Sequence, residues 1–180
     1  MSPLPVELGD GAILRRLELG DLERVWAAVD DERTRLDPWM AWIRHTRTID
    51  DQREWLEGVV ADERSLEGCG MFLGDEYLGG VGLMPGAYGI AGEIGYWIRS
   101  EFEGRGFVTR AVRALIEIGF RELGLHRIVI RAGSDNARSR AIPERLGFTQ
   151  EGIAREEGRG SDGFYDLVVY ALLEHEWPRS

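Results

Sequence analysis

The sequence predicts a single α/β domain, residues 1–180, built around a mixed sheet. The chain has 180 residues, which matches one domain and is enough to bury a core. Its hydrophobic content of 43% and charged content of 30% are those of an ordinary globular protein. Strand-like and helix-like segments alternate through the second half, and we find no repeat, low-complexity stretch or linker.

The first half of the chain contains one predicted strand and two predicted helices. Apolar residues from Leu22 to Val29 and from Trp55 to Val60 recur at helical spacing, and acidic residues that can cap a helix precede both runs. The pattern predicts a strand at 13–17, a helix capped by Asp21, an irregular aromatic segment at 38–43, and a helix capped within 50–52.

The rest of the chain predicts a hairpin followed by alternating strands and helices. Residues 70–73 and 77–83 flank a three-residue loop, which favours two antiparallel strands. Further expected elements are strands at 93–98 and 126–132, helices from Val108 to Phe120 and after Asn136, and strands at 148–157 and 164–173 joined by a turn at 158–163.

Charge and cysteine content exclude several classes of function. The net charge is −10, which does not suit a protein that tracks nucleic-acid phosphates but does suit cationic amines and basic peptides. The chain has no lysine, so Schiff-base chemistry on a lysine is excluded. Cys69 is the single cysteine and is interpreted as a small buried hydrophobe. With no disulfide, no signal peptide and no membrane-length apolar run, we expect a cytoplasmic protein.

A glycine pair, Gly104 and Gly106, lies between a predicted strand and a predicted helix. Free backbone N–H groups at a helix start bind anions such as a pyrophosphate, and glycines let the backbone approach the oxygens closely. Arg105 and Arg110 add positive charge, although a plain tight turn has the same composition. The Walker motif is excluded because it needs a lysine. The dinucleotide motif is disfavoured because Thr109 stands at its third glycine.

Asn136 is the only asparagine of the chain and follows a predicted strand. It is a natural helix N-cap. Ser139 would then lie in the first helical turn, where its hydroxyl could donate to a leaving thiolate. Simple capping and solvation remain the alternative interpretation of these two residues.

Taken together, these segments resemble the GCN5-related N-acetyltransferase (GNAT) superfamily. Its signature is Gln/Arg-x-x-Gly-x-Gly/Ala, and residues 103–108 match at Gly106 but depart at Glu103 and Val108. The similarity to the bacterial RimJ/RimL ribosomal-protein N-terminal acetyltransferases is closer and extends over nearly the whole chain. It rests on residues 94–98, 102–107, 135–139, 146–152 and 166–173, which occur in the same order.

The resemblance implies a mixed, mostly antiparallel sheet that splays at an acyl-coenzyme A site and is flanked by helices. It also implies acetyl-coenzyme A as donor, direct transfer to an amine, and no metal. A carboxylate beside a pyrophosphate is unfavourable, so Glu103 must point away or pair with an arginine. The implied donor residues are Trp97 or Ile98 for the thioester carbonyl, Gly104, Arg105, Gly106, Phe107, Val108 and Thr109 for the pyrophosphate, Asn136 for the pantetheine arm, and Ser139 for the sulfur.

On the acceptor side, the ammonium of the substrate must lose a proton before it attacks. The resemblance favours Glu157 or Glu156 as the base, with Asp166 as a further candidate. It also predicts that the acceptor pocket is bordered by Trp39, Trp42 and His45, although core packing explains the two tryptophans equally well.

The sequence does not decide which class of amine accepts the acetyl group. The resemblance favours the N-terminal α-amine of a protein, a ribosomal protein in particular. The alternatives are a small amine such as a polyamine or an aminoglycoside antibiotic, a longer acyl donor, and a non-catalytic acyl-coenzyme A-binding module. We expect no membrane or nucleic-acid partner, and a homodimer is also open because dimers are frequent among such relatives.

Overall fold

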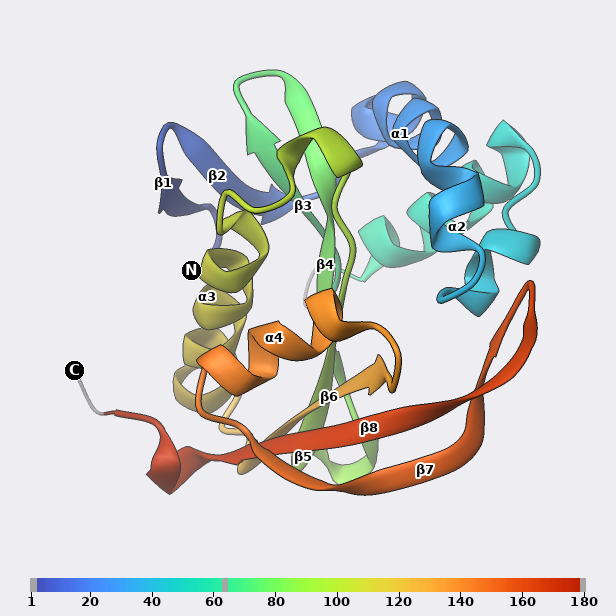
Figure 1. Ribbon diagram of the computed structural model, residues 1–180. Helices are drawn as coiled ribbons and strands as arrows, with labels where there is room; N and C mark the ends of the chain where they lie inside the picture. Colours follow the sequence, from blue (N-terminus) through green and yellow to red (C-terminus); the bar gives the residue numbers. More distant parts are fainter. Residues whose placement is uncertain (1–2, 63–64, 179–180) are drawn as a thin grey trace.

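The computed structural model describes residues 3–62 and 65–178, and within them eight strands form one sheet (Figure 1). The order across the sheet is β1-β2-β3-β4-β5-β6-β8-β7. All neighbouring strands are antiparallel except β5 and β6, so the prediction of a mixed, mostly antiparallel sheet is confirmed. The strands are β1 Val6–Gly9, β2 Ala12–Arg16, β3 Leu66–Leu73, β4 Glu76–Pro85, β5 Ala91–Tyr96, β6 Arg127–Gly133, β7 Thr149–Gly160 and β8 Gly163–Leu173.

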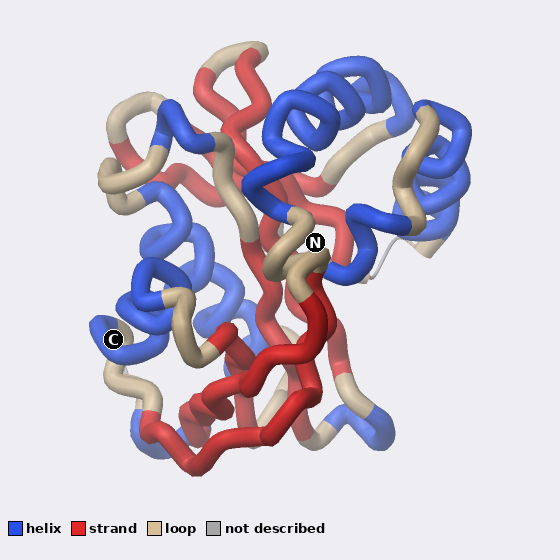
Figure 2. The backbone as a smooth tube through the Cα atoms, turned by 45° about the vertical axis from the view of Figure 1, so that its right-hand side comes forward, coloured by secondary structure: helices blue, strands red, loops and turns tan. Residues whose placement is uncertain are grey.

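The helices lie in two groups on either side of the strands (Figure 2). Helices α1 (Leu22–Leu36) and α2 (Ile49–Ala61) cover one face, while α3 (Phe107–Arg121) and α4 (Ala137–Arg145) cover the other. The parallel pair β5 and β6 needs a crossover connection, and α3 provides it.

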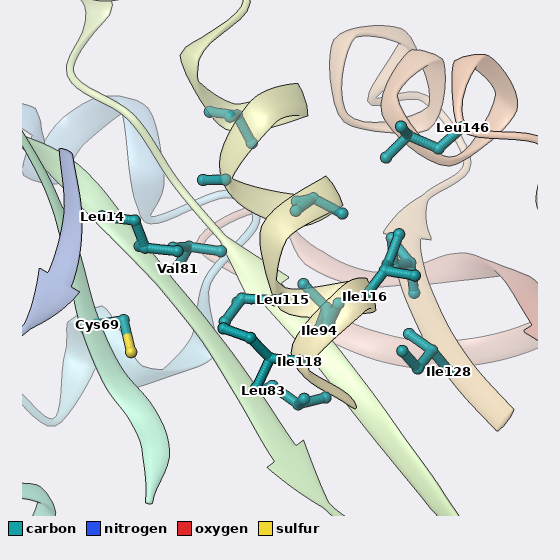
Figure 3. Packing of buried hydrophobic residues seen from close by; sticks show 14 of the residues in the cluster. Leu14, Cys69, Val81, Leu83, Ile94, Leu115, Ile116, Ile118, Ile128 and Leu146 are labelled. Carbon is teal, nitrogen blue, oxygen red and sulfur yellow. The ribbon is translucent and has the colours of Figure 1, made fainter. Parts of the chain in front are cut away.

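The larger core cluster lies between α3 and the sheet (Figure 3). Leu115 and Ile116 of α3 are fully buried against β4 and β5, where Val81, Leu83 and Ile94 face them. The apolar positions of α3 recur every three or four residues, so one continuous stripe is removed from water. A second cluster covers the opposite face and includes Val25, Val29, Leu56, Phe72 and Tyr77.

Three features in the first half of the chain differ from the sequence predictions. β1 was not predicted because it has only four residues, and the two that alternate inward, Val6 and Leu8, are too few to give a strand signal. Helix α2 is capped by Thr48 rather than within 50–52: the hydroxyl of Thr48 accepts from the Asp51 N–H, and the Asp51 carboxylate accepts from the Thr48 N–H. Asp21 makes no side-chain cap, because its carboxylate instead binds Arg15 and the Glu18 N–H.

The turn predicted at 158–163 is also shorter, because Gly158 and Gly160 belong to β7. A Cβ on Gly160 would lie 1.8 Å from the Pro38 carbonyl oxygen, so this glycine allows a close backbone approach and not a turn. The Ser161 N–H donates to the Asp37 carbonyl at 3.2 Å. The tip of the β7–β8 hairpin is thereby joined to the segment that follows α1.

Gly160→Ala is therefore expected to lower the free energy of unfolding by about 1–3 kcal/mol, because the new methyl group forces two backbones apart. Gly152→Ala on the same strand is the matched control, since a Cβ there meets nothing within 4 Å. Urea denaturation of both variants measures the difference. Equal midpoints would contradict the proposed close approach.

Candidate active site

The sheet opens between β5 and β6. Pairing between these strands is confined to Ala91–Glu93 and Arg127–Val129, whereas β5 stays paired with β4 as far as Tyr96. The next N–H, that of Trp97, donates to a β4 carbonyl at 2.9 Å. The Ile98 N–H has no acceptor among the described residues. The predicted splay is confirmed, and of the two predicted backbone donors only Ile98 has an N–H that is free for a ligand.

The loop before α3 presents six consecutive backbone N–H groups, from Gly104 to Thr109, that donate to no other described residue. Gly104 and Gly106 have φ angles of +75° and +77°, a left-handed conformation that favours glycine. Since α3 begins directly after Gly106, its first N–H groups and its positive dipole end face the same place. Arg145 reaches this loop from α4 and donates to the Thr109 hydroxyl at 3.2 Å. The loop therefore fits a pyrophosphate.

Glu103, which departs from the family signature, is paired with two arginines. Its carboxylate lies 2.8 Å from Nη1 of Arg35 and 2.6 Å from Nη1 of Arg138. The Arg35 guanidinium also donates to the Ile98 carbonyl, so α1 is tied to the end of β5. The negative charge of Glu103 is thus neutralised by arginines beside the glycine loop, one of the two arrangements that the sequence required.

A buried carboxylate, Glu32, supports the same loop from α1. It accepts hydrogen bonds from the Ser100 N–H at 2.6 Å and the Ser100 hydroxyl at 2.7 Å, and it pairs with Arg35. Burial alone would raise the pKa of Glu32, but these hydrogen bonds outweigh burial and hold the pKa below its ordinary value. Glu32 is therefore ionised at neutral pH and keeps Arg35 in position between the two carboxylates.

The prediction that Asn136 caps a helix is confirmed. Its side-chain oxygen accepts from the Ser139 N–H at 3.1 Å, at the start of α4. The Tyr96 hydroxyl donates to the Ser139 carbonyl at 2.8 Å and lies 3.3 Å from the Ser139 hydroxyl. Burial raises the pKa of Tyr96 well above its ordinary value, so this hydroxyl keeps its proton. Tyr96 thereby holds Ser139 beside the point where the sheet opens.

A cleft of about 710 Å³ lies on the face of the sheet that α1 and α2 cover. Of the predicted acceptor-side residues, Trp39, Trp42 and Glu157 line it, whereas His45 and Glu156 do not. His45 is exposed. We call this cleft the aromatic cleft; its lining includes Trp39, Trp42, Trp55, Tyr77, Glu93, Tyr96, Trp97, Glu157 and Tyr165.

Two carboxylates, Glu93 and Glu157, share one wall of the aromatic cleft. Arg131 of β6 lies between them: its Nη1 pairs with Glu93, and its Nε is 4.0 Å from the Glu157 carboxylate. Burial raises the pKa of Glu93, Arg131 lowers it and Glu157 raises it further, with a net upward shift. A carboxylate with a raised pKa in a cleft is suited to accept a proton near neutral pH.

A β-bulge in β7 lies at Glu156 and Glu157, of which only Glu157 lines the aromatic cleft. The register of β7 against β8 shifts between Ala154 and Gly158, and Glu156 has a φ of +53°. The Glu156 N–H donates to the Asp166 carboxylate at 2.8 Å. Since a bulge changes the direction of neighbouring side chains, Asp166 supports the conformation that leaves Glu157 in the cleft.

Other chemistries find little support in the described residues. Cys69 also lines the cleft, but burial raises the pKa of its thiol to about 12, so a thiolate nucleophile is not available at neutral pH. Residues 3–62 and 65–178 contain no group of three or more potential ligand side chains placed to hold a metal ion. None of the helices described is long and apolar enough to cross a bilayer.

Comparison with known proteins decides the family. The model of the acetyltransferase (GNAT) domain matches residues 12–149. A Bacillus subtilis protein named "Putative ribosomal N-acetyltransferase YdaF" is 37% identical over 169 residues, which are 91% of this chain and 92% of that protein. The chain belongs to the GNAT acetyltransferase family.

Two further relatives extend the comparison for this GNAT acetyltransferase. The ribosomal-protein-serine acetyltransferase of Escherichia coli is 24% identical over 173 residues, which are 93% of this chain and 96% of that protein. The microcin C7 self-immunity acetyltransferase MccE was solved with acetyl-coenzyme A and AMP. It is 25% identical, has a TM-score of 0.85, and the match covers 96% of this chain and 97% of that structure. The family and these relatives identify the chain as an N-acetyltransferase.

Two residues of this GNAT site were not singled out from the sequence. Glu93 was part of a predicted strand, and its alternation with Gly95 and Trp97 on one face could have indicated that all three look into one cleft. The Tyr96 side chain packs against the core cluster that contains α3, and its contact with Ser139 joins segments 43 residues apart. No pattern of neighbouring residues in the sequence predicts the contact between Tyr96 and Ser139.

Proposed function

We propose that this GNAT acetyltransferase transfers the acetyl group of acetyl-coenzyme A to the N-terminal α-amine of a protein, with ribosomal proteins as the first candidates. The observation that carries the proposal is the gap between β5 and β6. On one side of it lie the free N–H groups of the loop and of Ile98, and on the other lies the aromatic cleft with the Glu93 and Glu157 carboxylates. The names of the Bacillus and E. coli relatives and the net charge of −10, which suits a basic N-terminal segment, support the acceptor class.

The donor side of the proposed site binds acetyl-coenzyme A and polarises its thioester carbonyl. Acetyl-coenzyme A supplies an acetyl group activated as a thioester. The N–H groups from Gly104 to Thr109 bind the pyrophosphate, and the side-chain N–H groups of Asn136 are available for the pantetheine arm. The Ile98 N–H donates to the thioester carbonyl oxygen, where negative charge develops during attack. Arg35, which binds the Ile98 carbonyl, ties this end of the strand to α1.

The acceptor side of the proposed site moves protons. Glu157 and Glu93 take the proton from the incoming ammonium, because a protonated amine has no lone pair to attack with. The Ser139 hydroxyl, held by Tyr96, donates a hydrogen bond to the departing sulfur, which leaves as the thiolate of coenzyme A. Transfer is direct, and bringing amine and thioester together across the gap supplies much of the rate.

Acetylation assays test this proposal. Peptides that copy ribosomal-protein N termini are compared with the same peptides blocked at the α-amine, with spermidine and with an aminoglycoside, while thiol release is followed. We expect thiol release with free N termini only. Faster acetylation of spermidine or the aminoglycoside would overturn the acceptor class. Failure of acetyl-coenzyme A to raise the thermal midpoint would overturn the donor site and leave a non-catalytic module.

A further inference from the structure

The aromatic cleft is larger than a small acceptor needs. Its volume of about 710 Å³ falls within the roughly 300–1,000 Å³ of pockets that enclose whole drug-sized ligands. An N-terminal alanine or serine presents one methyl or hydroxymethyl group beside its amine. Such a group by itself fills a small part of about 710 Å³, so the volume leaves room for a bulkier neighbour of the amine.

The walls of the aromatic cleft are rigid apolar rings. Four of the six tryptophans of the chain line it. Trp97 is braced by Trp42 at 6.4 Å and by Tyr77 at 5.8 Å between ring centroids, and Trp39 contacts Tyr165 edge-on at 5.6 Å. Rings that support each other in this way are preorganised to receive another flat apolar group by stacking or edge contact.

Two of the lining tryptophans leave much of their surface in water. Trp42 is 37% exposed and Trp55 is 39% exposed, although both are large and apolar. Trp42 comes from the segment between α1 and α2, and Trp55 comes from α2 itself. An occupant that covers these rings removes apolar surface from water, and a larger apolar group covers more of that surface than a small one.

The charges of the cleft give the occupant an orientation. Glu93 and Glu157 lie on β5 and β7 and mark the place of the amine, and Trp42 and Trp55 belong to the helical layer over the same face. A ligand therefore presents a cation to the sheet and an apolar group to the helical layer. That combination is an amine with a large hydrophobic group on or next to its α-carbon.

We infer that the preferred acceptor of this enzyme carries a bulky apolar group, best an aromatic ring, beside the amine that is acetylated. For a protein acceptor this means a large apolar first residue instead of alanine or serine. The inference rests on the proposed function for the identity of the reaction. What the inference adds is that the aromatic cleft selects which amines are acetylated.

The experiment compares peptides that differ only in their first residue: alanine, serine, methionine, phenylalanine or tryptophan. We expect kcat/KM at least about tenfold higher for phenylalanine than for alanine, the order of discrimination that a hydrophobic pocket provides. Trp42→Ala and Trp55→Ala should each reduce this preference, because kcat/KM falls more for the phenylalanine peptide than for the alanine peptide. Trp55→Ala is the safer variant for folding, because that side chain is already substantially exposed.

Trp26→Ala is the matched control for loss of a tryptophan. Trp26 lies on α1, packs under the Arg33 guanidinium at 5.5 Å and is not part of the cleft lining, so its removal should leave the preference unchanged. Equal or faster reaction of the alanine or serine peptide would overturn the inference. So would an equal loss for all peptides in Trp42→Ala and Trp55→Ala.

Assays with small amines as acceptors test this inference separately from the proposed function. If acetyl-coenzyme A binds but no peptide is acetylated, the protein acceptor is wrong, and phenethylamine is then compared with ethylamine as acceptor. A preference for phenethylamine that Trp55→Ala removes supports the inference independently of any peptide. Equal rates with the two amines overturn it.

Discussion

Gly106→Ala is expected to lower the affinity for acetyl-coenzyme A by roughly 10- to 100-fold, the effect of losing one hydrogen bond to a charged group. Gly106 has a φ of +77°, and a Cβ there would lie 3.3 Å from Nη1 of Arg110. The methyl group would also stand where phosphate oxygens approach the loop N–H groups. Isothermal titration calorimetry with acetyl-coenzyme A measures the change.

Two controls make this prediction specific. Gly74→Ala places a methyl group at another left-handed position, φ +58°, in the β3–β4 turn, where nothing lies within 4 Å. It should cost about 1–2 kcal/mol of stability and no affinity. S-acetylpantetheine, which lacks the pyrophosphate, should bind Gly106→Ala as it binds the wild type. Affinity within twofold of wild type for the full donor would contradict the assigned pyrophosphate loop.

Glu157→Gln is expected to lower kcat by about 100-fold, within the range typical of a lost general base. The amide keeps the shape of the side chain but cannot accept the proton of an ammonium. Glu156→Gln removes the same charge one residue away, outside the aromatic cleft, and should stay within twofold of wild type. Steady-state kinetics with a saturating donor compares the two variants. Equal losses in both would assign the effect to net charge and remove Glu157 from the mechanism.

The pH profile tests the pairing of Glu157 with Glu93. Because the pKa of Glu93 is raised, the wild-type rate should fall as the pH drops through a value above that of an ordinary glutamate. Glu157 contributes to that upward shift, so Glu157→Gln lowers the Glu93 pKa and moves the acidic limb of its residual activity to lower pH. The double variant with Glu93→Gln should lose less than the product of the single losses, since the two carboxylates act together. An acidic limb that does not move in Glu157→Gln would argue against the pair.

Local features were predictable because their causes are local. The cap at Asn136 and the apolar stripe of α3 depend on residues a few positions apart, and both appear as expected. The turn predicted at 158–163 was too long, because glycines that allow a close backbone approach look like turn glycines in a sequence. The family resemblance placed His45 and Glu156 on the acceptor side, but neither lines the cleft: His45 is exposed and Glu156 lies in the β7 bulge.

By itself the sequence determined the order of the elements, the glycine loop before α3, the cap at the start of α4, and the family. Only the tertiary structure decided how the acidic residue of the signature is neutralised, since Arg35 lies 68 positions from Glu103. It also decided the acceptor side, where Trp42, Glu93 and Glu157 meet from three distant segments. Helix periodicity and capping arise from contacts within one turn of the chain. The cleft depends on strand register, on one bulge and on the opening of the sheet, which come from packing between segments that no local pattern relates.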